Sequence, residues 1–558
     1  MSRPRRKKAG PRPAPPPAID LRFDELVAIV ERAKAAALSP EDHAKLKAAM
    51  DTLAFITAEL QTKQTSLDRL RRLLFGAPTE KTRMILGSGA APGAPGASGS
   101  PSAAAAPPAA GAPRPGHGRT GAAAYTGADT VTIAHPSLRR GDGCPGCTTG
   151  KIYPLAEPAT LVRITGMAPL GATVYACARW RCNLCGEVFT APAPEGVGAA
   201  KYDATAASMV GLLKYGCGLP FHRIETLQRA MRIPLPAATQ WELVRDATPP
   251  LVPAWDELLR QAAQGEVVYN DDTTMKVLAL TAEQRRAAAA DEETDARTGV
   301  FTSGIVATRA GHRIALFFTG RQHAGENLAD VLAQREADLG PPIQMCDALP
   351  TNTAGDFDTL LAGCIAHARR RFVDVVDNFP AEVRHVLETL REVYRTDALA
   401  RDRALSPEER LRVHQTASGP LMAGLATWLR QQLDDHLVEP SSGLGAAIAY
   451  MLKHWAKLTL FLRVPGAPLD NNACERALKK AILHRKNALF YKTLAGARVG
   501  DVFMSLIHTA ELNGIAPFEY LVTLQRQHQD VALDPSDWMP WNYTVALTEL
   551  RARAGPSR

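Results

Sequence analysis

Alternating apolar and polar side chains between residues 265 and 350 predict a β-rich segment. GEVVYNDDTTMKVLAL alternates with a period of two, and VFTSGIVATR and HRIALFFTG have the composition of two further strands. ENLADVLAQREADLG then has the character of a helix, and PPIQMCDALP is a short apolar run that ends in an acid. The predicted order is therefore three strands, a helix and a fourth strand.

This order matches a ribonuclease-H-like α/β core, a mixed sheet with flanking helices in which the first and fourth strands are neighbours. Asp271 lies in the first predicted strand and Asp347 ends the fourth, so we expect their carboxylates side by side. Two adjacent carboxylates repel each other unless a cation neutralises them, and oxygen ligands favour Mg²⁺ or Mn²⁺. Neighbouring strand residues face opposite ways, so at most one of Asp271 and Asp272 should face the metal.

Glu475 is the candidate for a third acid. It lies in GAPLDNNACERALKKAILHRKNALFYKT, in the first turn of a predicted helix. Further along this helix lie basic residues, and such residues could hold a phosphodiester near a metal site. They include Lys479, Lys480, Arg485, Lys486 and Lys492.

Each acid also has a purely structural interpretation. Glu475 lies three residues after Asn472 and could be the glutamate of a capping box. Asp272 could be the ligand in place of Asp271. Asp347 could open an Asx-turn before Pro350.

Residues 199–264 are predicted to be helical, with breaks at Leu219-Pro220 and at Ile233 to Pro236. A helix, a turn and a second helix resemble a helix-turn-helix, which would place the helix from Thr239 to Val244 against DNA. Two packed helices without a nucleic-acid role explain the pattern nearly as well.

The catalytic domain is predicted to span residues 265–500 and to contain a helical insertion at about 375–455. Asp347 and Glu475 are 128 residues apart, and the sequence between them has helical segments such as PAEVRHVLETLREVYR and PLMAGLATWLRQQLDDHL. The final residues, 501–558, are predicted to form a C-terminal helical segment.

The N-terminal part combines three predicted regions: a disordered basic tail at 1–20, a helix with coiled-coil spacing at 21–86 and a flexible linker at 87–128. In the linker, 36 of 42 residues are Gly, Ala, Pro or Ser, a composition that buries too little apolar surface to fold. Ser39, Pro40 and Asp42 are typical of a helix start. Leucine then recurs every seven residues, which favours self-association, although one amphipathic helix packed on its own chain is the alternative. The leucines at this spacing are Leu46, Leu53, Leu60, Leu67 and Leu74.

Residues 129–198 contain two CxxC pairs and are predicted to form a zinc-ribbon-like DNA-binding domain. Four thiolates could close a tetrahedral zinc site, and the runs ATLVRI and ATVYACARWRC have the character of ribbon strands. Four unmetallated structural thiols are the alternative. The cysteines of the two CxxC pairs are Cys144, Cys147, Cys182 and Cys185.

Composition excludes some classes of protein but does not identify a function. The chain has 558 residues, enough for several domains, and a net charge of +8, which suits a polyanionic partner without identifying one. Nine cysteines, an odd and clustered set, favour a reducing compartment. The basic N-terminus is followed by a Pro-rich stretch rather than an apolar signal, and no run is long enough to span a membrane. We therefore expect a bacterial cytoplasmic, nucleoid-associated protein with no membrane contact.

Two stretches resemble a known family. LDNNACERALKKAILHRKNALF and GCIAHARRRF are similar to the transposases of the insertion-sequence sixty-six family, a DDE group, and the similarity extends over most of the chain. Further matching segments are LRRLLFGAPTEK, YGCGLPFHR and HTAELNGIAPFEYL.

The resemblance implies that Asp271, Asp347 and Glu475 match the family's catalytic acids and hold two Mg²⁺ or Mn²⁺ ions. It implies a DDE transposase that binds the terminal inverted repeats of an insertion sequence and catalyses DNA strand cleavage and strand transfer, with zinc as a structural ion. The expected partners are double-stranded DNA at the element ends and target, a second copy in a homodimer or larger synaptic assembly, and accessory proteins of the same element.

His367, Arg369 and Arg370 match a Cys-x-x-His-x-Arg-Arg stretch of the family, and they would either contact DNA phosphate or hold the insertion against the core. The remaining predicted DNA contacts follow Glu475 and are Arg476, Lys479, Lys480, Arg485 and Lys486.

The chain departs from the family in two places. Asn270, Asp271 and Asp272 stand where the family has a His-Ala-Asp-Glu setting, and Ala348 to Asn352 replace a stretch with Gly and Tyr. Two rival functions stay open: a nuclease or resolvase with the same metal site, and a non-catalytic zinc-containing DNA-binding regulator. A strand-transfer assay and metal-dependent cleavage would separate them.

Overall fold

The computed structural model describes residues 200–289, 297–355 and 357–554, with short stretches at 28–30, 32–33, 39–50, 139–142, 151, 153, 169–181, 188–192 and 194. The predicted basic tail, the linker, most of the predicted coiled coil and all four predicted zinc cysteines lie outside these residues. Contacts divide the chain into two compact units, residues 90–171 and the remainder. In the smaller unit, the described backbone includes a turn at 139–142, where the Asp142 carboxylate accepts a hydrogen bond of 2.6 Å from the Arg139 backbone N–H.

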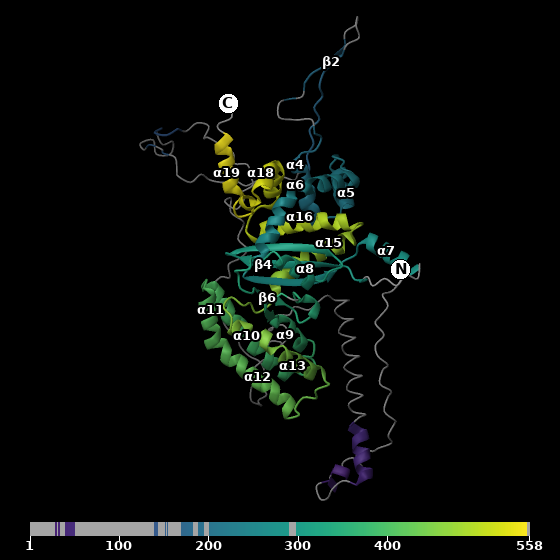
Figure 1. Ribbon diagram of the computed structural model, residues 1–558, viewed down its shortest axis with the longest axis vertical. Coiled ribbons are helices and arrows are strands. Elements are labelled where there is room, and N and C mark those ends of the chain that lie inside the picture. The colour runs from purple at the N-terminus through teal and green to yellow at the C-terminus, as the bar shows by residue number, and fades with distance from the viewer. Residues whose placement is uncertain are drawn as a thin grey trace, which may run out of the picture. The chain divides into compact units, whose positions relative to one another are not determined.

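A five-stranded mixed sheet lies at the centre of the larger unit, in the order β5-β4-β3-β6-β7 (Figure 1). β3, β4 and β5 pair antiparallel, whereas β6 runs parallel to both β3 and β7. The prediction that the first and fourth strands are adjacent is confirmed, because Val267 pairs with Ile343 and Tyr269 with Met345. The strands are β3 (Val267–Thr274), β4 (Phe301–Arg309), β5 (His312–Gly320), β6 (Ile343–Cys346) and β7 (Leu360–Gly363).

The edge strand β5 is covered by α16 (Leu494–Leu512). Backbone N–H groups of alternate β5 residues donate to side chains on successive turns of α16: Ala315 to Thr509 and Phe317 to Ser505, both at 3.0 Å, and Thr319 to Asp501 at 2.8 Å. An exposed strand edge can pair with another chain. Here the side chains of α16 accept hydrogen bonds from the backbone N–H groups at this edge instead.

Helices cover both faces of the sheet around β3 and β4. α8 (Ala324–Leu332) contacts one face, while α15 (Asn472–Ala488) contacts the other. The predicted helix between the third and fourth strands is thus confirmed as α8. A further helix, α7 (Leu278–Ala289), follows β3 where the sequence favoured continued strand.

The segment at 199–264 forms helices with the two predicted breaks. α4 (Ala204–Gly211) continues into a π-helical turn at Leu212–Gly216, α5 (Phe221–Ala230) begins after Pro220, and α6 (Ala237–Ala263) begins after Pro236. α6 packs on α4, α16 and β4. In the predicted recognition segment, Gln240 and Val244 are buried and Glu242 is exposed.

Between β7 and α15 the chain is helical, as predicted for the insertion. Apolar residues of these helices and of β3, β6 and β7 form one continuous buried cluster, which includes Ile343, Met345, Phe372, Leu390 and Leu429. Figure 1 shows α10 to α13 together on one side of the sheet. The elements are α9 (Ile365–Val373), α10 (Pro380–Asp402), α11 (Pro407–Val413), a π-helical turn at His414–Ser418, α12 (Gly419–Asp434), α13 (Gly443–Lys453), α14 (Trp455–Leu458) and a 3₁₀ turn at Leu460–Leu462.

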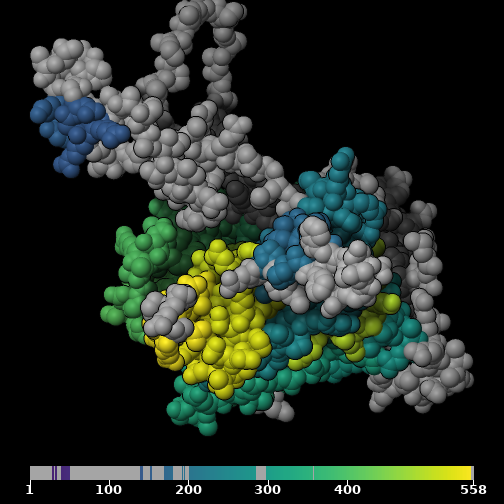
Figure 2. Space-filling view, turned by 90° about the horizontal axis from the view of Figure 1, so that it is seen from above, coloured from purple at the N-terminus to yellow at the C-terminus, as the bar shows by residue number. Residues whose placement is uncertain are grey.

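The C-terminal helices pack against the helices of the 200–263 segment. α17 (Pro517–Arg526) contacts α4 and α6, and α18 (His528–Leu533) contacts α6, so the two segments lie side by side in Figure 2. α19 (Tyr543–Ala554) follows a 3₁₀ turn at Pro535–Trp538.

Two short elements complete the described chain. β1 (Arg179–Arg181) pairs antiparallel with β2 (Val188–Thr190). A helix at 40–50 begins at the predicted start, where the Asp42 N–H donates to Ser39 Oγ at 3.1 Å. Among the described residues, no helix has both the length and the apolar character needed to cross a membrane.

Candidate active site

Asp271 lies in the middle of β3 and faces α15. Its partner across the β3–β4 pair is Gly304, and a Cβ atom added there would lie 3.0 Å from the side chain of Leu478 on α15. Cys474 Sγ also donates to the Gly304 carbonyl at 3.1 Å. Directly opposite side chains in an antiparallel pair share a face of the sheet, so the Asp271 carboxylate points to the side that carries Glu475.

Asp271 and Asp347 are brought together by one amide. Asn352 Nδ2 donates to Asp347 Oδ1 at 2.7 Å and lies 3.3 Å from Asp271 Oδ1. Asp347 follows β6, the parallel neighbour of β3, and its Oδ1 also accepts the backbone N–H of Leu349 at 3.1 Å. The predicted Asx-turn at Asp347 is therefore present, and the same carboxylate still lies beside Asp271.

The surroundings of Asp271 disfavour its negative charge. Burial raises the pKa of Asp271 to about 7, although the backbone N–H of Asp272 partly offsets this by stabilising the carboxylate. The negative charges of Asp347, Asp272 and Glu475 raise the pKa further. A carboxylate in such a place requires a proton or a cation near neutral pH, and either partner would relieve the repulsion among these acids.

Asp272 lies on the opposite face of the sheet. Its Oδ2 is 2.8 Å from Nδ1 of His323, the residue that precedes α8. Ser303, the β4 partner of Asp272, likewise accepts a hydrogen bond from Asn327 of α8 at 2.9 Å. The two adjacent aspartates therefore face different helices, and Asp271 is the one beside Asp347.

Glu475 is not a helix cap. α15 begins at Asn472 with Asn471 as its N-cap, and that cap makes no side-chain hydrogen bond to the helix. The capping-box interpretation of Asn472 and Glu475 is therefore wrong, because the helix starts one residue earlier than that motif requires. The Oε1 atom of Glu475 is buried without a hydrogen-bond partner and lies 3.7 Å from Nδ1 of His367 on α9. An unpaired buried carboxylate oxygen of this kind is free to take a cation.

Donor atoms of Cys364, His367 and Glu475 all lie within 4.8 Å of one another. The thiol has a structural role in this group, because Cys364 Sγ accepts the backbone N–H of Asn471 at 3.3 Å. Burial raises the pKa of the Cys364 thiol to about 11. The three side chains therefore form a candidate ligand group that includes Glu475.

Four buried amide side chains, which sequence reasoning missed, connect the segments that carry the three acids. Gln344 Nε2 donates to Asn270 Oδ1 at 3.0 Å and to the Asn352 carbonyl at 2.8 Å, and Asn270 Nδ2 donates to that carbonyl at 2.7 Å. Asn471 Nδ2 donates to the Asn270 carbonyl at 3.0 Å. These residues, which we call the amide network, are at most 1% exposed. The signal in the sequence is an amide within an otherwise apolar strand, in VVYND and IQMC.

The predicted DNA-contacting residues of α15 fall into two groups. Arg485 is bonded to Thr273 and Thr274 at the end of β3, and Lys480 lies 2.9 Å from Glu511 of α16. These two therefore hold α15 to its neighbours. The other three are exposed and recur at helical spacing along one side of α15: Arg476, Lys479 and Lys486.

His367, Arg369 and Arg370 are half-buried on α9, and Nδ1 of His367 lies 3.7 Å from Oε1 of Glu475. The four cysteines predicted to bind zinc lie outside the described residues. Cys182 and Cys185 belong to the six-residue connection between β1 and β2.

Comparison with known proteins shows the family of the chain. Residues 200–499, more than half of the chain, match the model of the Transposase IS66 family. The chain belongs to this family of transposases.

Three uncharacterized proteins of Sinorhizobium fredii are similar to the chain. y4jD is 35% identical over 187 residues, which cover 33% of this chain and 36% of y4jD. y4hP is 27% identical over 393 residues, covering 66% and 67% of the two chains, and y4qI is 28% identical over 355 residues, covering 60% and 61%. The matches thus span about a third of y4jD and close to two thirds of the other two.

Proposed function

We propose that the protein is a DDE transposase with a ribonuclease-H-like core, which cuts DNA at the ends of an insertion sequence and joins the freed ends to target DNA. The observation that carries the proposal is the convergence of Asp271 and Asp347 on one amide, on the face of the sheet where α15 presents Glu475. Membership of a transposase family supports the same reaction class.

The donor set fits a divalent metal. The Asp271 pKa is raised by burial and by its acidic neighbours, while Glu475 Oε1, Asn352 Oδ1 and Asn471 Oδ1 are buried without hydrogen-bond partners. Carboxylate and amide oxygens of this kind suit Mg²⁺ or Mn²⁺. We propose that Asp271, Asp347 and Glu475 hold two such ions, which would supply Lewis-acid stabilisation of the phosphodiester charge and lower the pKa of a water nucleophile.

The residues around the acids position the DNA strand. The exposed side of α15 carries Arg476, Lys479 and Lys486 within a few helical turns of Glu475, so phosphates bound there would lead toward the acids. His367 lies against Glu475 and is placed to contact the same phosphate. The amide network fixes the strands and the helix that carry the acids, so their spacing does not depend on the substrate.

The remaining segments of the chain would recognise the DNA ends of the element and join two copies of the protein. We propose that Cys144, Cys147, Cys182 and Cys185 bind one structural Zn²⁺, that this domain and the helices at 199–264 read the inverted repeats, and that the heptad region joins two copies so that two ends meet. The β1–β2 pair, whose connection contains Cys182 and Cys185, agrees with a zinc-binding hairpin. Accessory proteins of the same element are further expected partners.

The test is Mg²⁺-dependent cleavage and strand transfer on DNA carrying the inverted repeats that flank the gene. Asp271→Asn, Asp347→Asn and Glu475→Gln should each lower the cleavage rate by at least about 100-fold while DNA binding persists. The matched control is Asp272→Asn, which removes the adjacent carboxylate on the other face of the sheet and should keep the rate within about 10-fold of wild type.

The alternatives give different results. Cleavage without strand transfer would indicate a nuclease or resolvase. DNA binding with no cleavage by the wild type in Mg²⁺ or Mn²⁺ would indicate a non-catalytic regulator. An active Asp271→Asn beside an inactive Asp272→Asn would place the site on the α8 face and contradict the assignment.

A further inference from the structure

A basic surface that contains no acidic residue extends from the active site across the helical insertion. Residues 440–469, which form α13, α14 and the turn at Leu460–Leu462, contain no Asp or Glu, and neither do the residues of α9. α9 packs on α13, and α14 packs on β7. We call this the insertion surface, and its exposed cations include Arg371, Lys453, Lys457 and Arg463.

The cations of this surface are available to an anion. Lys453 and Lys457 are exposed, and neither forms an ion pair with any carboxylate in the described part of the chain. The Arg371 guanidinium lies 3.8 Å from the centre of the Tyr450 ring, and its side chain is exposed, so the face turned away from the ring can meet a ligand. Burial lowers the pKa of His454, and the charges of Lys457, Lys453 and Arg371 lower it further, which agrees with a positive potential over the whole surface.

The insertion surface adjoins the acids. A Cβ atom at Gly363 in β7 would lie 3.3 Å from Lys457 Cβ. Gly363 pairs with Cys346, the residue immediately before Asp347. Lys457 therefore stands one strand away from the end of β6, and a chain of phosphates could pass from Asp347 onto this surface without crossing an acidic side chain.

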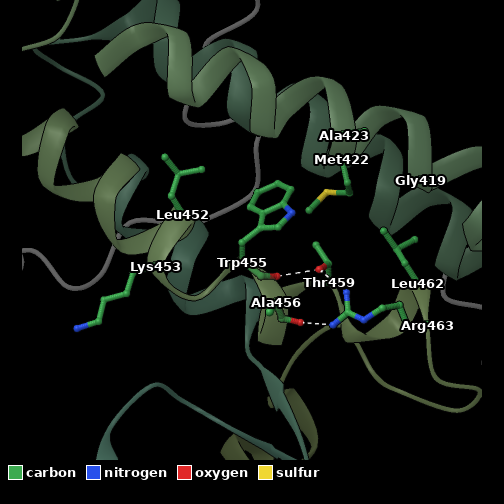
Figure 3. Close-up of a pocket in the computed structure, with 10 residues that line it drawn as sticks. All are labelled: Gly419, Met422, Ala423, Leu452, Lys453, Trp455, Ala456, Thr459, Leu462 and Arg463. Atoms are coloured by element: carbon green, nitrogen blue, oxygen red, sulfur yellow. Dashed lines mark hydrogen bonds between the residues drawn. The ribbon is translucent and has the colours of Figure 1, made fainter. Parts of the chain in front are cut away.

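The insertion surface also contains a hollow of about 580 Å³. Figure 3 shows the Trp455 indole projecting into it, between Leu452 and Met422, with Lys453 on one side and Arg463 on the other. Arg463 is held there by hydrogen bonds to Thr459 Oγ1 at 3.0 Å and to the carbonyl of Ala456. An aromatic ring with a cation on either side has the chemistry that takes a nucleobase and its phosphates. The other lining residues are Gly419, Ala423, Thr459, Ala456 and Leu462.

We propose that the insertion surface binds an unpaired DNA strand at the cleaved end, with its phosphates on Arg371, Lys453 and Lys457 and one base stacked on Trp455. The proposal rests on the DNA substrate of the proposed function, and it assigns the helical insertion a part in that reaction. An unpaired strand fits better than a duplex, because base pairing and stacking hide the base faces that a ring such as Trp455 would contact.

The first test measures binding by the full-length protein without divalent metal, using a fluorescent blunt duplex and the same duplex with a single-stranded tail. Lys453→Gln/Lys457→Gln should weaken binding of the tailed DNA by about 10-fold and reduce the salt slope by roughly 1.4, as expected for two single-strand phosphates. Binding of the blunt duplex should stay within about 2-fold. The charge-matched control, Arg403→Gln/Arg430→Gln, removes two exposed cations elsewhere in the insertion and should change neither affinity.

The second test separates stacking from charge. Trp455→Ala should weaken binding of the tailed DNA by about 10-fold, whereas Trp455→Phe, which keeps a ring, should retain most of the affinity. Thermal unfolding of both variants shows whether the insertion is still folded.

The proposal would be overturned if these variants lost equal affinity for blunt and tailed DNA, or lost affinity for neither. Both results are distinct from failure of the proposed function, which would appear as a wild-type protein that binds DNA but never cleaves it in Mg²⁺ or Mn²⁺.

Discussion

Asn352 is the side chain that contacts both aspartates, and its replacement should affect the reaction more than the fold. Asn352→Ala removes the donor shared by Asp271 and Asp347, but it keeps the Asn352 carbonyl that accepts from Asn270 and Gln344. We expect the Mg²⁺ concentration for half-maximal cleavage to rise by roughly 10- to 100-fold, as for other residues that orient metal ligands.

The neighbouring Thr353 provides the control for Asn352. Its hydroxyl donates only to the Pro350 carbonyl at 2.8 Å, so Thr353→Ala should leave the Mg²⁺ dependence unchanged. A similar increase in the Mg²⁺ requirement of both variants would mean that the turn, rather than the Asn352 amide, determines the metal affinity.

Asp501 should make the stability of the protein depend on pH. Burial raises the pKa of Asp501 to about 7, against the opposing hydrogen bonds from the backbone and hydroxyl of Thr319. Because the folded pKa exceeds the ordinary value of 3.8, the folded state holds this proton more tightly. Its contribution to stability is complete below pH 4 and is lost as pH rises through about 7.

Asp501→Asn should remove this pH dependence, since an amide can accept from the Thr319 N–H and donate to its hydroxyl. The free energy of unfolding of the variant, relative to wild type, should rise by roughly 1–3 kcal/mol between pH 4 and pH 8. Urea unfolding across this range measures it, with Asp402→Asn at an exposed position as the control for loss of a charge. A difference that is constant with pH would contradict the expectation.

At the scale of elements, a close approach between α8 and the turn that carries Asn352 depends on one glycine. A Cβ atom at Gly325 would lie 2.0 Å from the Thr353 carbonyl oxygen and 2.7 Å from that of Thr351. Gly325→Ala should therefore separate α8 from the turn, lower the free energy of unfolding by about 1–3 kcal/mol and reduce cleavage.

Gly424 gives the opposite expectation for the same substitution. It is exposed within α12, and a Cβ atom there would meet nothing within 4 Å. Gly424→Ala should stabilise the protein by about 0.5–1 kcal/mol, because alanine loses less backbone entropy in a helix. Chemical denaturation of the two variants compares them directly, and a stabilising Gly325→Ala would refute the close approach.

Elements with a strong local pattern could be predicted from the sequence. The alternation in β3, β4 and β5 and the apolar run of β6 predicted the strands, and their order correctly predicted the β3–β6 pair. β7 was missed because its four residues carry little pattern and its pairing with β6 is set by the tertiary fold. α6 continues through Pro249, Pro250 and Pro253, residues that ordinarily end a helix.

The sequence selected the acids of the candidate site but not the residues that contact them. Asp271, Asp347 and Glu475 could be chosen by type and by the resemblance, whereas the choice between Asp271 and Asp272 needed the register with β4. Asn352 and Asn471 could not be selected, because their roles depend on contacts with segments 81 and 201 residues away. The predictions for the zinc cysteines, the coiled coil and the recognition helix stay predictions.

At the scale of the whole molecule, the insertion and the sheet share one core. The buried cluster runs from Ile343 and Met345 of β6 into α10. The two ends of the insertion also meet, because the Ile365 N–H donates to the Leu469 carbonyl at 3.0 Å. We therefore expect the insertion and the sheet to unfold together.

Leu390→Ala tests this coupling from a position within the insertion. Leu390 is fully buried in α10, and its truncation should cost about 2–5 kcal/mol. Thermal unfolding should remain a single transition, and hydrogen exchange should accelerate in β6 and β7 as well as in α10. Leu399→Ala, in the same helix but 47% exposed, should have little effect. Faster exchange confined to the insertion helices would show two independent units.

The shared core has a consequence for damaged copies of the gene. Under the proposed function, an in-frame deletion within the insertion would not leave a smaller enzyme that still cuts DNA, since the apolar side chains of β6 and β7 would lose their cover. Loss of part of this segment should therefore silence the copy completely, and shortened descendants should persist in a genome as inert remnants rather than as a source of unregulated breaks.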